Sequence, residues 1–161
     1  MSTALLVFGA NGQVAQEIAV IAESLGFTPT LAGRDRVDLS TEDGVALLDE
    51  LEPACVINAA AYTAVDRAED EPFATHRLNS KVPGLLAKAC KARRLPFVHI
   101  STDYVFDGTK AGPYVETDPR APLGVYGLSK AQGEEAVLAV GGDVAIAVSY
   151  THLTLPTIYS V

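Results

Sequence analysis

The sequence has few cysteines and no excess of basic residues. Cys55 and Cys90 are the two cysteines among 161 residues, and each lies in an apolar-patterned segment. A disulfide framework or a zinc site would need more partners, so we expect buried free thiols and assign no metal ligand. The formal net charge is −8. Without a basic stripe to neutralise phosphates, a nucleic-acid partner is not expected.

Targeting signals and long apolar runs are also lacking. The start, Met1-Ser2-Thr3, has neither the basic region nor the cleavage site of a secretory signal. The apolar run from Ala4 to Ala10 is far too short to span a bilayer. We therefore expect a cytoplasmic protein with no membrane partner. The length fits one domain with a sizeable core.

Strand-like apolar runs alternate with helical patterns, which predicts an α/β fold with a doubly wound parallel sheet. The expected strands cover residues 4–8, 28–32, 55–59, 97–100 and 143–148. The expected helices cover residues 12–25, 40–53, 73–94 and 123–140, with Ser40 as the N-cap of the second and Pro83 kinking the third or starting a fresh first turn. In the first helix, we predict a buried face of Val14, Ile18, Ile21 and Ala22.

The residues from Val148 onward follow a different pattern. The stretch VSYTHLTLPTIYSV has no charged residue and no clear period. It reads as an ordinary exposed tail, but VSYTHLTLPT also resembles the translation of a transposon adapter used in sequencing libraries. We therefore interpret residues 1–147 as the domain and residues 148–161 as a non-native tail. A sheet that stops there would leave its fifth strand as an exposed apolar edge.

A glycine loop lies between the first strand and the first helix. Residues 9–15, GANGQVA, form a Gly-x-x-Gly-x-x-Ala variant of the dinucleotide fingerprint. Gly9 permits the tight turn, Gly12 lets the backbone approach a pyrophosphate, and Ala15 allows close helix–strand packing. The following helix N-terminus favours an anion. A tight turn without a ligand is the alternative, but the position after the first strand favours nucleotide binding.

Arg34 follows the second strand, where the adenosine ribose lies in such folds. A basic residue there can pair with a 2′-phosphate, which favours NADPH over NADH. The neighbouring Asp35 could instead accept hydrogen bonds from the ribose hydroxyls, and Arg34 could be a solvated surface residue. The sequence thus favours NADPH and leaves NADH open.

Tyr126 and Lys130 are spaced i, i+4 on the last helix, so their side chains lie on one face. A nearby ammonium lowers a tyrosine pKa, and the pair is thereby suited to acid catalysis. A plain helix-surface contact is the alternative. Thr102 ends the fourth strand, at the edge where ligands of open α/β sheets bind. Its hydroxyl could donate to the carbonyl oxygen that Tyr126 would protonate.

Together these residues resemble the extended short-chain dehydrogenase/reductase family and, within it, the dTDP-4-dehydrorhamnose reductases. The resemblance implies a Rossmann-like fold, truncated here after about five strands. It rests on FGANGQVA at 8–15, VINAAAYTAVDRAE at 56–69, STDYVFDG at 101–108 and PLGVYGLSKAQGE at 122–134.

The resemblance also implies roles for individual residues. The catalytic residues are Thr102, Tyr126 and Lys130, and the sugar faces Thr102 and Asp103. Asn79 is a structural or proton-relay residue, while Val65, Asp66 and Glu69 shape and cap the following helix. Arg34 is expected at the cofactor from its position after the second strand. The resemblance adds these cofactor-binding residues: Gly9, Asn11, Gly12, Gln13, Val14, Asp38, Leu39, Ala61, Tyr62, Thr63, Tyr126 and Lys130.

The implied reaction is the NADPH-dependent reduction of the 4-keto group of dTDP-4-dehydro-L-rhamnose to dTDP-L-rhamnose, a step toward cell-surface polysaccharide. Family members continue into a substrate-binding domain that roughly doubles their length, and the full-length protein could form a homodimer. We expect this chain alone to bind cofactor weakly and to turn over little substrate. A 4-epimerase or dehydratase that holds NAD tightly, and a non-enzymatic NADP-binding regulatory subunit, are the alternatives.

Overall fold

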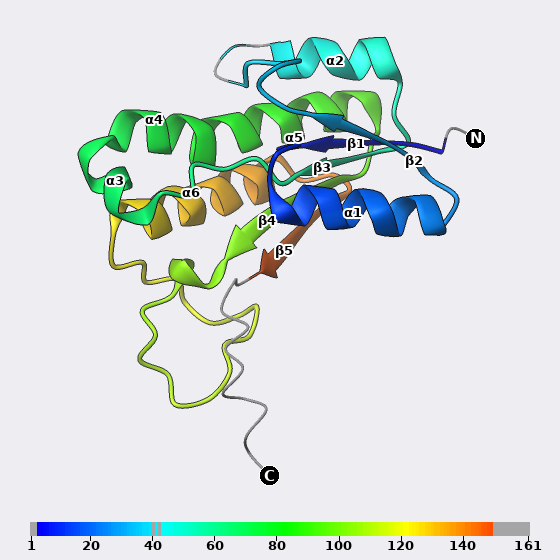
Figure 1. Cartoon of the computed structure of the whole chain (residues 1–161). Coiled ribbons are helices and arrows are strands. Elements are labelled where there is room, and N and C mark those ends of the chain that lie inside the picture. Colours follow the sequence, from blue (N-terminus) through cyan, green and yellow to red (C-terminus); the bar gives the residue numbers. More distant parts are fainter. Residues whose placement is uncertain (1–2, 40, 42, 150–161) are drawn as a thin grey trace.

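The computed structural model describes residues 3–39, 41 and 43–149 as a five-stranded sheet flanked by helices (Figure 1). Every neighbouring pair of strands is parallel, and the strand order is β2-β1-β3-β4-β5. The strands are β1 (Ala4–Phe8), β2 (Thr28–Ala32), β3 (Cys55–Asn58), β4 (Phe97–Thr102) and β5 (Val144–Ser149). The predicted fold class is confirmed.

Between successive strands the chain forms one or more helical segments. They are α1 (Gln13–Ser24), α2 (Asp43–Leu51), α3 (Val65–Asp70), α4 (Pro72–His76), the π-helical turn η1 (Arg77–Lys81), α5 (Val82–Arg93), the 3₁₀ turn η2 (Asp103–Val105) and α6 (Val125–Val140). Ser40, the predicted N-cap, lies outside the described residues. No helix in the described part of the chain is both long and apolar enough to cross a membrane.

The long helix predicted over residues 73–94 is divided by the π-helical turn η1. Pro83 lies in the first turn of α5, so its prediction as the start of a fresh turn is confirmed. Proline has no backbone N–H and cannot donate to the Asn79 carbonyl one turn earlier. The wider turn at η1 accommodates that missing hydrogen bond.

Apolar side chains are buried on both faces of the sheet. On one face, α1 packs through Ala15 and Ala22 against Leu5 and Val7. On the other, α2, α5 and α6 cover the larger cluster, which includes Leu6, Phe8, Leu48, Val56, Leu86, Phe97 and Val137. Ile21 is 56% exposed, so its predicted burial is wrong. Ala15 and Ala22 lie seven residues apart on one face, and Ile21 is turned by about 100° from Ala22.

Strand β5 forms one edge of the sheet and pairs with β4 alone among the described strands. Ala145, Ala147 and Val148 are exposed on it, which confirms the predicted apolar edge. The strand also includes Val148 and Ser149, the first two residues of the segment that we interpret as non-native. The rest of that segment, 150–161, lies outside the described residues.

Both cysteines are free thiols, as the sequence predicts. Cys90 is buried, and burial raises the pKa of its thiol to about 12. Cys55 is half-buried, which is less than the full burial that we expected. Its position on β3 leaves part of the side chain accessible.

Candidate active site

The predicted site residues gather at one edge of the sheet. Since all strands are parallel, their carboxyl ends meet there, and the strand order reverses between β1 and β3. Open α/β sheets bind ligands at such a reversal. The glycine loop follows β1, Ala61 to Thr63 follow β3, and Thr102 ends β4.

The glycine loop has the geometry that a bound pyrophosphate needs. Gly9 has φ +100°, and a Cβ there would lie 2.8 Å from the Ala59 carbonyl carbon, so no larger residue fits. Gly12 is the N-cap of α1 and contributes no side-chain cap, and the first turn carries no acidic residue. The first N–H groups of α1 are therefore open to an anion. Ala15 is buried, as predicted.

The remaining residues predicted near the cofactor lie on the loops around this edge. Asn11 and Gln13 are exposed beside Gly12. Arg34 is exposed in the turn that follows β2. Farther along the same loop, Asp38 is exposed, whereas Leu39 is half-buried and packs against the larger apolar cluster.

Asn79 holds the segment after β3 against α6. Its Oδ1 accepts from the Tyr62 backbone N–H at 2.8 Å, and its Nδ2 donates to the Tyr62 carbonyl at 3.0 Å and to Ser129 Oγ at 3.0 Å. Ser129 Oγ in turn donates to the Tyr126 carbonyl at 2.7 Å. The fully buried Asn79 thus links two predicted site segments, while its role as a proton relay stays a prediction.

The structure brings Thr102 and Tyr126 together. Both side chains are buried, and Thr102 lies close enough to lower the pKa of Tyr126. Thr102 also donates to the exposed Asp103 carboxylate at 3.1 Å. The close approach of α6 to η2 requires Gly127, because a Cβ there would lie 2.2 Å from the Tyr104 carbonyl oxygen. The Tyr104 ring meets the Tyr126 ring edge-on at 5.4 Å between centroids.

The pKa of Tyr126 differs from the expectation. Burial raises it, the Thr102 side chain lowers it, and Asp103 and Tyr104 act in the same direction as burial. The predicted lowering by Lys130 is therefore wrong for this structure. Lys130 is 2% exposed, and its Nζ donates to the Ile100 carbonyl at 2.6 Å. Burial lowers the pKa of Lys130 itself to about 8.

Glu69 fixes the start of α6 from a distant helix. Its Oε1 accepts from the Val125 backbone N–H at 2.8 Å, one residue before Tyr126. We predicted that Glu69 caps the following helix, and the helix that it caps is α6, 56 residues along the chain. A carboxylate at a helix N-terminus accepts a hydrogen bond from a free backbone N–H and interacts favourably with the positive end of the helix dipole.

Replacing Glu69 by alanine should therefore destabilise the protein by about 1 kcal/mol. Glu69→Gln keeps an acceptor oxygen but loses the charge, so it should recover part of that loss. Urea unfolding of both variants measures the difference. Equal stability of Glu69→Ala and the unchanged protein would show that the cap is unimportant.

Two buried neighbours of Lys130, Glu134 and His99, were missed by the sequence reasoning. Glu134 is buried one turn after Lys130, accepts from Ser101 Oγ, and pairs with Arg120 at 2.9 Å. His99 is fully buried beside Lys130. The alternation of the sequence does predict that His99 is buried, because its side chain lies on the same face of the strand as those of Phe97 and Ser101.

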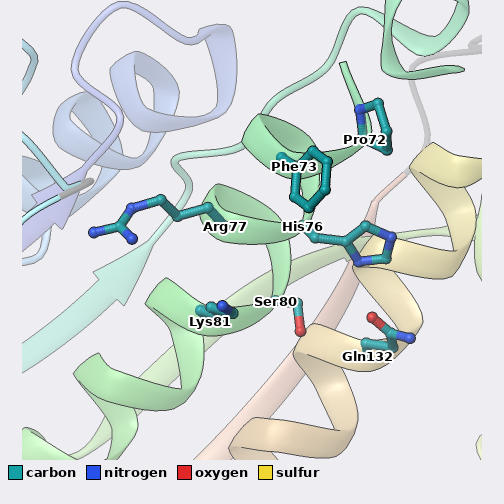
Figure 2. Close-up of a pocket in the computed structure, with 7 residues that line it drawn as sticks. All are labelled: Pro72, Phe73, His76, Arg77, Ser80, Lys81 and Gln132. Carbon is teal, nitrogen blue, oxygen red and sulfur yellow. The ribbon is translucent and has the colours of Figure 1, made fainter. Parts of the chain in front are cut away.

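A separate hollow of about 380 Å³ lies between α4–η1 and α6, and none of the predicted site residues line it (Figure 2). Its lining residues are Pro72, Phe73, His76, Arg77, Ser80, Lys81 and Gln132. Gln132 follows Lys130 by two positions, and residues so spaced on a helix face different ways. The hollow is therefore distinct from the edge that holds Thr102 and Tyr126.

Comparison with known proteins agrees with this geometry. A dTDP-4-dehydrorhamnose reductase of Burkholderia thailandensis is 50% identical over 140 residues, which cover 86% of this chain and 47% of that protein. A crystal structure of the Clostridium acetobutylicum dTDP-4-dehydrorhamnose reductase matches with a TM-score of 0.86 and 33% identity, over 91% of this chain and 53% of that one. The Bacillus anthracis enzyme, solved in complex with NADP, matches with a TM-score of 0.86 and 30% identity, over 92% and 53%.

The chain spans about half the length of the curated relatives that it matches. The family model described as the RmlD substrate binding domain matches residues 3–149, nearly the whole described chain. These findings confirm the resemblance that the sequence motifs indicate. The chain therefore belongs to the RmlD substrate binding domain family, whose members include the dTDP-4-dehydrorhamnose reductases named above.

Proposed function

We propose that this chain is the N-terminal, cofactor-binding half of a reductase that uses NADPH to convert dTDP-4-dehydro-L-rhamnose to dTDP-L-rhamnose. The observation that carries the proposal is the pair of buried side chains Thr102, at the carboxyl end of β4, and Tyr126 beside it, with Lys130 buried one turn behind. The names of the relatives support the substrate. In the proposed full-length protein, residues 1–147 are joined to a substrate-binding half.

The glycine loop and the residues around it are proposed to bind NADPH. The backbone of Gly9 to Val14 holds the pyrophosphate, because Gly9 admits no Cβ and the α1 N-terminus lacks a side-chain cap. Arg34 pairs with the 2′-phosphate, and Ala61 to Thr63 line the bound dinucleotide. When bound, NADPH supplies the hydride that reduces the sugar carbonyl carbon.

The protein's own residues donate the proton and orient the sugar. Tyr126 donates its phenolic proton to the carbonyl oxygen, and its raised pKa keeps that proton in place before reaction. Thr102 polarises the same oxygen through its hydroxyl, and Asp103 faces the sugar. We propose that Lys130 anchors the nicotinamide ribose.

Arg34→Ala should weaken NADPH binding roughly 10- to 100-fold, because a hydrogen bond to a charged group contributes about 1.5–3 kcal/mol. NADH has no 2′-phosphate, so its dissociation constant should hardly change. The matched control is Arg36→Ala, since Arg36 lies two residues on and pairs with Glu50 at 3.2 Å. Titration of both cofactors measures the effect, and an equal loss for NADPH and NADH would place Arg34 away from the 2′-phosphate.

The proposed activity is tested by incubating the full-length protein with NADPH and dTDP-4-dehydro-L-rhamnose. We expect NADPH to be consumed one for one with the dTDP-L-rhamnose formed. An NAD that copurifies with the protein, together with sugar conversion without net NADPH consumption, would favour the epimerase alternative instead. A cytoplasmic location and a homodimer of the full-length protein stay predictions of the family resemblance.

A further inference from the structure

Glu134 lies at the end of a row of buried side chains on α6. Tyr126, Lys130 and Glu134 are spaced four residues apart, so they lie on one face of the helix. Glu134 is 7% exposed, and a carboxylate in such a place needs hydrogen-bond donors and a compensating charge. Both of its oxygens have a partner, and the two partners come from different segments of the chain.

The first partner lies at the end of β4. Ser101 Oγ donates to Glu134 Oε1. Ser101 is buried and directly precedes Thr102, the last residue of the strand. The hydrogen bond to Ser101 therefore ties to α6 the strand end that carries Thr102.

The second partner lies in the segment that leads back to α6. Arg120 Nη1 donates to Glu134 Oε2 at 2.9 Å. Residues 106–120 form a loop whose ends are close, because the Ala121 backbone N–H donates to the Val105 carbonyl at 2.9 Å. Figure 1 shows this segment as the yellow-green loop that projects beyond the tip of β4. Glu134 thus also holds the chain that follows η2.

We propose that Glu134 is a positioning residue for the proposed reduction. Through Ser101 and Arg120, it fixes the end of β4 against α6. Thr102, which lies between these two partners in the chain, is thereby held beside Tyr126. The inference rests on the proposed function for the reaction, and it deepens that proposal by naming the group that sets the placement of these two residues.

The ion pair of Glu134 and Arg120 is expected to contribute geometry more than stability. Replacing a buried ion pair by apolar side chains of similar volume is often neutral or stabilising. Charge-assisted hydrogen bonds, in contrast, have preferred lengths and directions. A displacement of about 1 Å at a reacting group can lower the rate about 100-fold. Loss of the pair should therefore affect catalysis more than folding.

The first test replaces the ion pair by apolar side chains in the full-length protein. Glu134→Met combined with Arg120→Met removes both links and should change Tm little. Well below Tm, we expect kcat to fall about 100-fold, while the NADPH dissociation constant stays unchanged because the glycine loop lies at another strand end. The matched control is Glu135→Met, since Glu135 is exposed and lies 3.9 Å from Arg120 Nη2. An unchanged kcat, or equal losses of kcat and of NADPH binding, would overturn the inference.

Ser101→Ala separates the geometry from the charge of Glu134. That charge raises the pKa of Lys130, so the double variant changes the surroundings of the lysine as well as the strand end. Ser101→Ala leaves the charge and the link to Arg120 in place and removes only the hydrogen bond to β4. We expect kcat to fall roughly tenfold. A normal kcat in this variant would contradict the inference.

A measurement without substrate keeps this test separate from the reductase assay. In cofactor-free protein with ¹³C at the threonine methyl groups, the Thr102 signal is identified by its loss in Thr102→Val. We expect this signal to shift in Ser101→Ala and in the double variant, whereas that of Thr75, fully buried in α4, stays in place. If the unsubstituted protein lacks reductase activity, the proposed function fails, and the Thr102 signal still decides the inference. An unmoved Thr102 signal in both variants would overturn it.

Discussion

Tyr126→Phe in the full-length protein should lower kcat roughly 100- to 10,000-fold, the range that general acid catalysis contributes. The phenylalanine ring preserves the edge-on contact with Tyr104 and the packing in the first turn of α6. It removes the hydroxyl whose pKa Thr102 influences and that would protonate the carbonyl oxygen. Binding of NADPH should survive, because the pyrophosphate contacts lie at the distant glycine loop.

The matched control for this variant is Tyr104→Phe. Tyr104 contributes the neighbouring ring and is 52% exposed, so loss of its hydroxyl should leave kcat nearly unchanged. Single-turnover kinetics and cofactor titration on both variants separate chemistry from binding. A Tyr126→Phe enzyme with normal turnover would rule out Tyr126 as the acid, and a pure NADP-binding subunit would show no activity in either protein.

Gly133→Ala should destabilise the protein by about 1–3 kcal/mol, the usual cost of overpacking. The added Cβ would lie 2.1 Å from the Asn79 backbone oxygen, and neither α6 nor η1 can move without disturbing the other. In an unconstrained helix the same change stabilises by up to about 1 kcal/mol through helix propensity. A loss of stability would therefore indicate that α6 packs closely against η1, and a gain would indicate that it does not.

Thermal unfolding measures this effect, with Gly112→Ala as the control. Gly112 has open space where its Cβ would be, so that change should stay within about 0.5 kcal/mol. For a protein of this size, each kcal/mol lowers Tm by about 2–4 °C. A Gly133→Ala protein that is as stable as the control would show that α6 and Asn79 are not in contact.

Sequence patterns were sufficient for the strands and for the segments at their ends. Residues 4–8 and 28–32 form β1 and β2 as predicted, because short apolar runs bounded by glycine give a clear strand signal. The glycine loop and Thr102 could be placed for the same reason, since carboxyl ends of parallel strands share an edge. The spacing of Tyr126 and Lys130 likewise predicted a common helix.

What the sequence did not reveal depends on contacts between distant segments. The π-helical turn at 77–81 lies where Asn79 meets Gly133 of α6, and no local pattern records that approach. Lys130 Nζ contacts His99, 31 residues earlier, and the Ile100 carbonyl, so helical spacing alone suggested a partnership with Tyr126 that this structure lacks. Glu69 is similar, because its capped helix lies far along the chain.

We propose that Tyr126 and NADPH together reduce a sugar 4-keto group in the full-length protein. The most direct measurement uses NADPH deuterated at the transferable C4 position of nicotinamide, with dTDP-4-dehydro-L-rhamnose as substrate. We predict one deuterium at C4 of the dTDP-L-rhamnose formed for each NADPH consumed. Product without deuterium, or no product while NADPH stays bound and unchanged, would contradict this account.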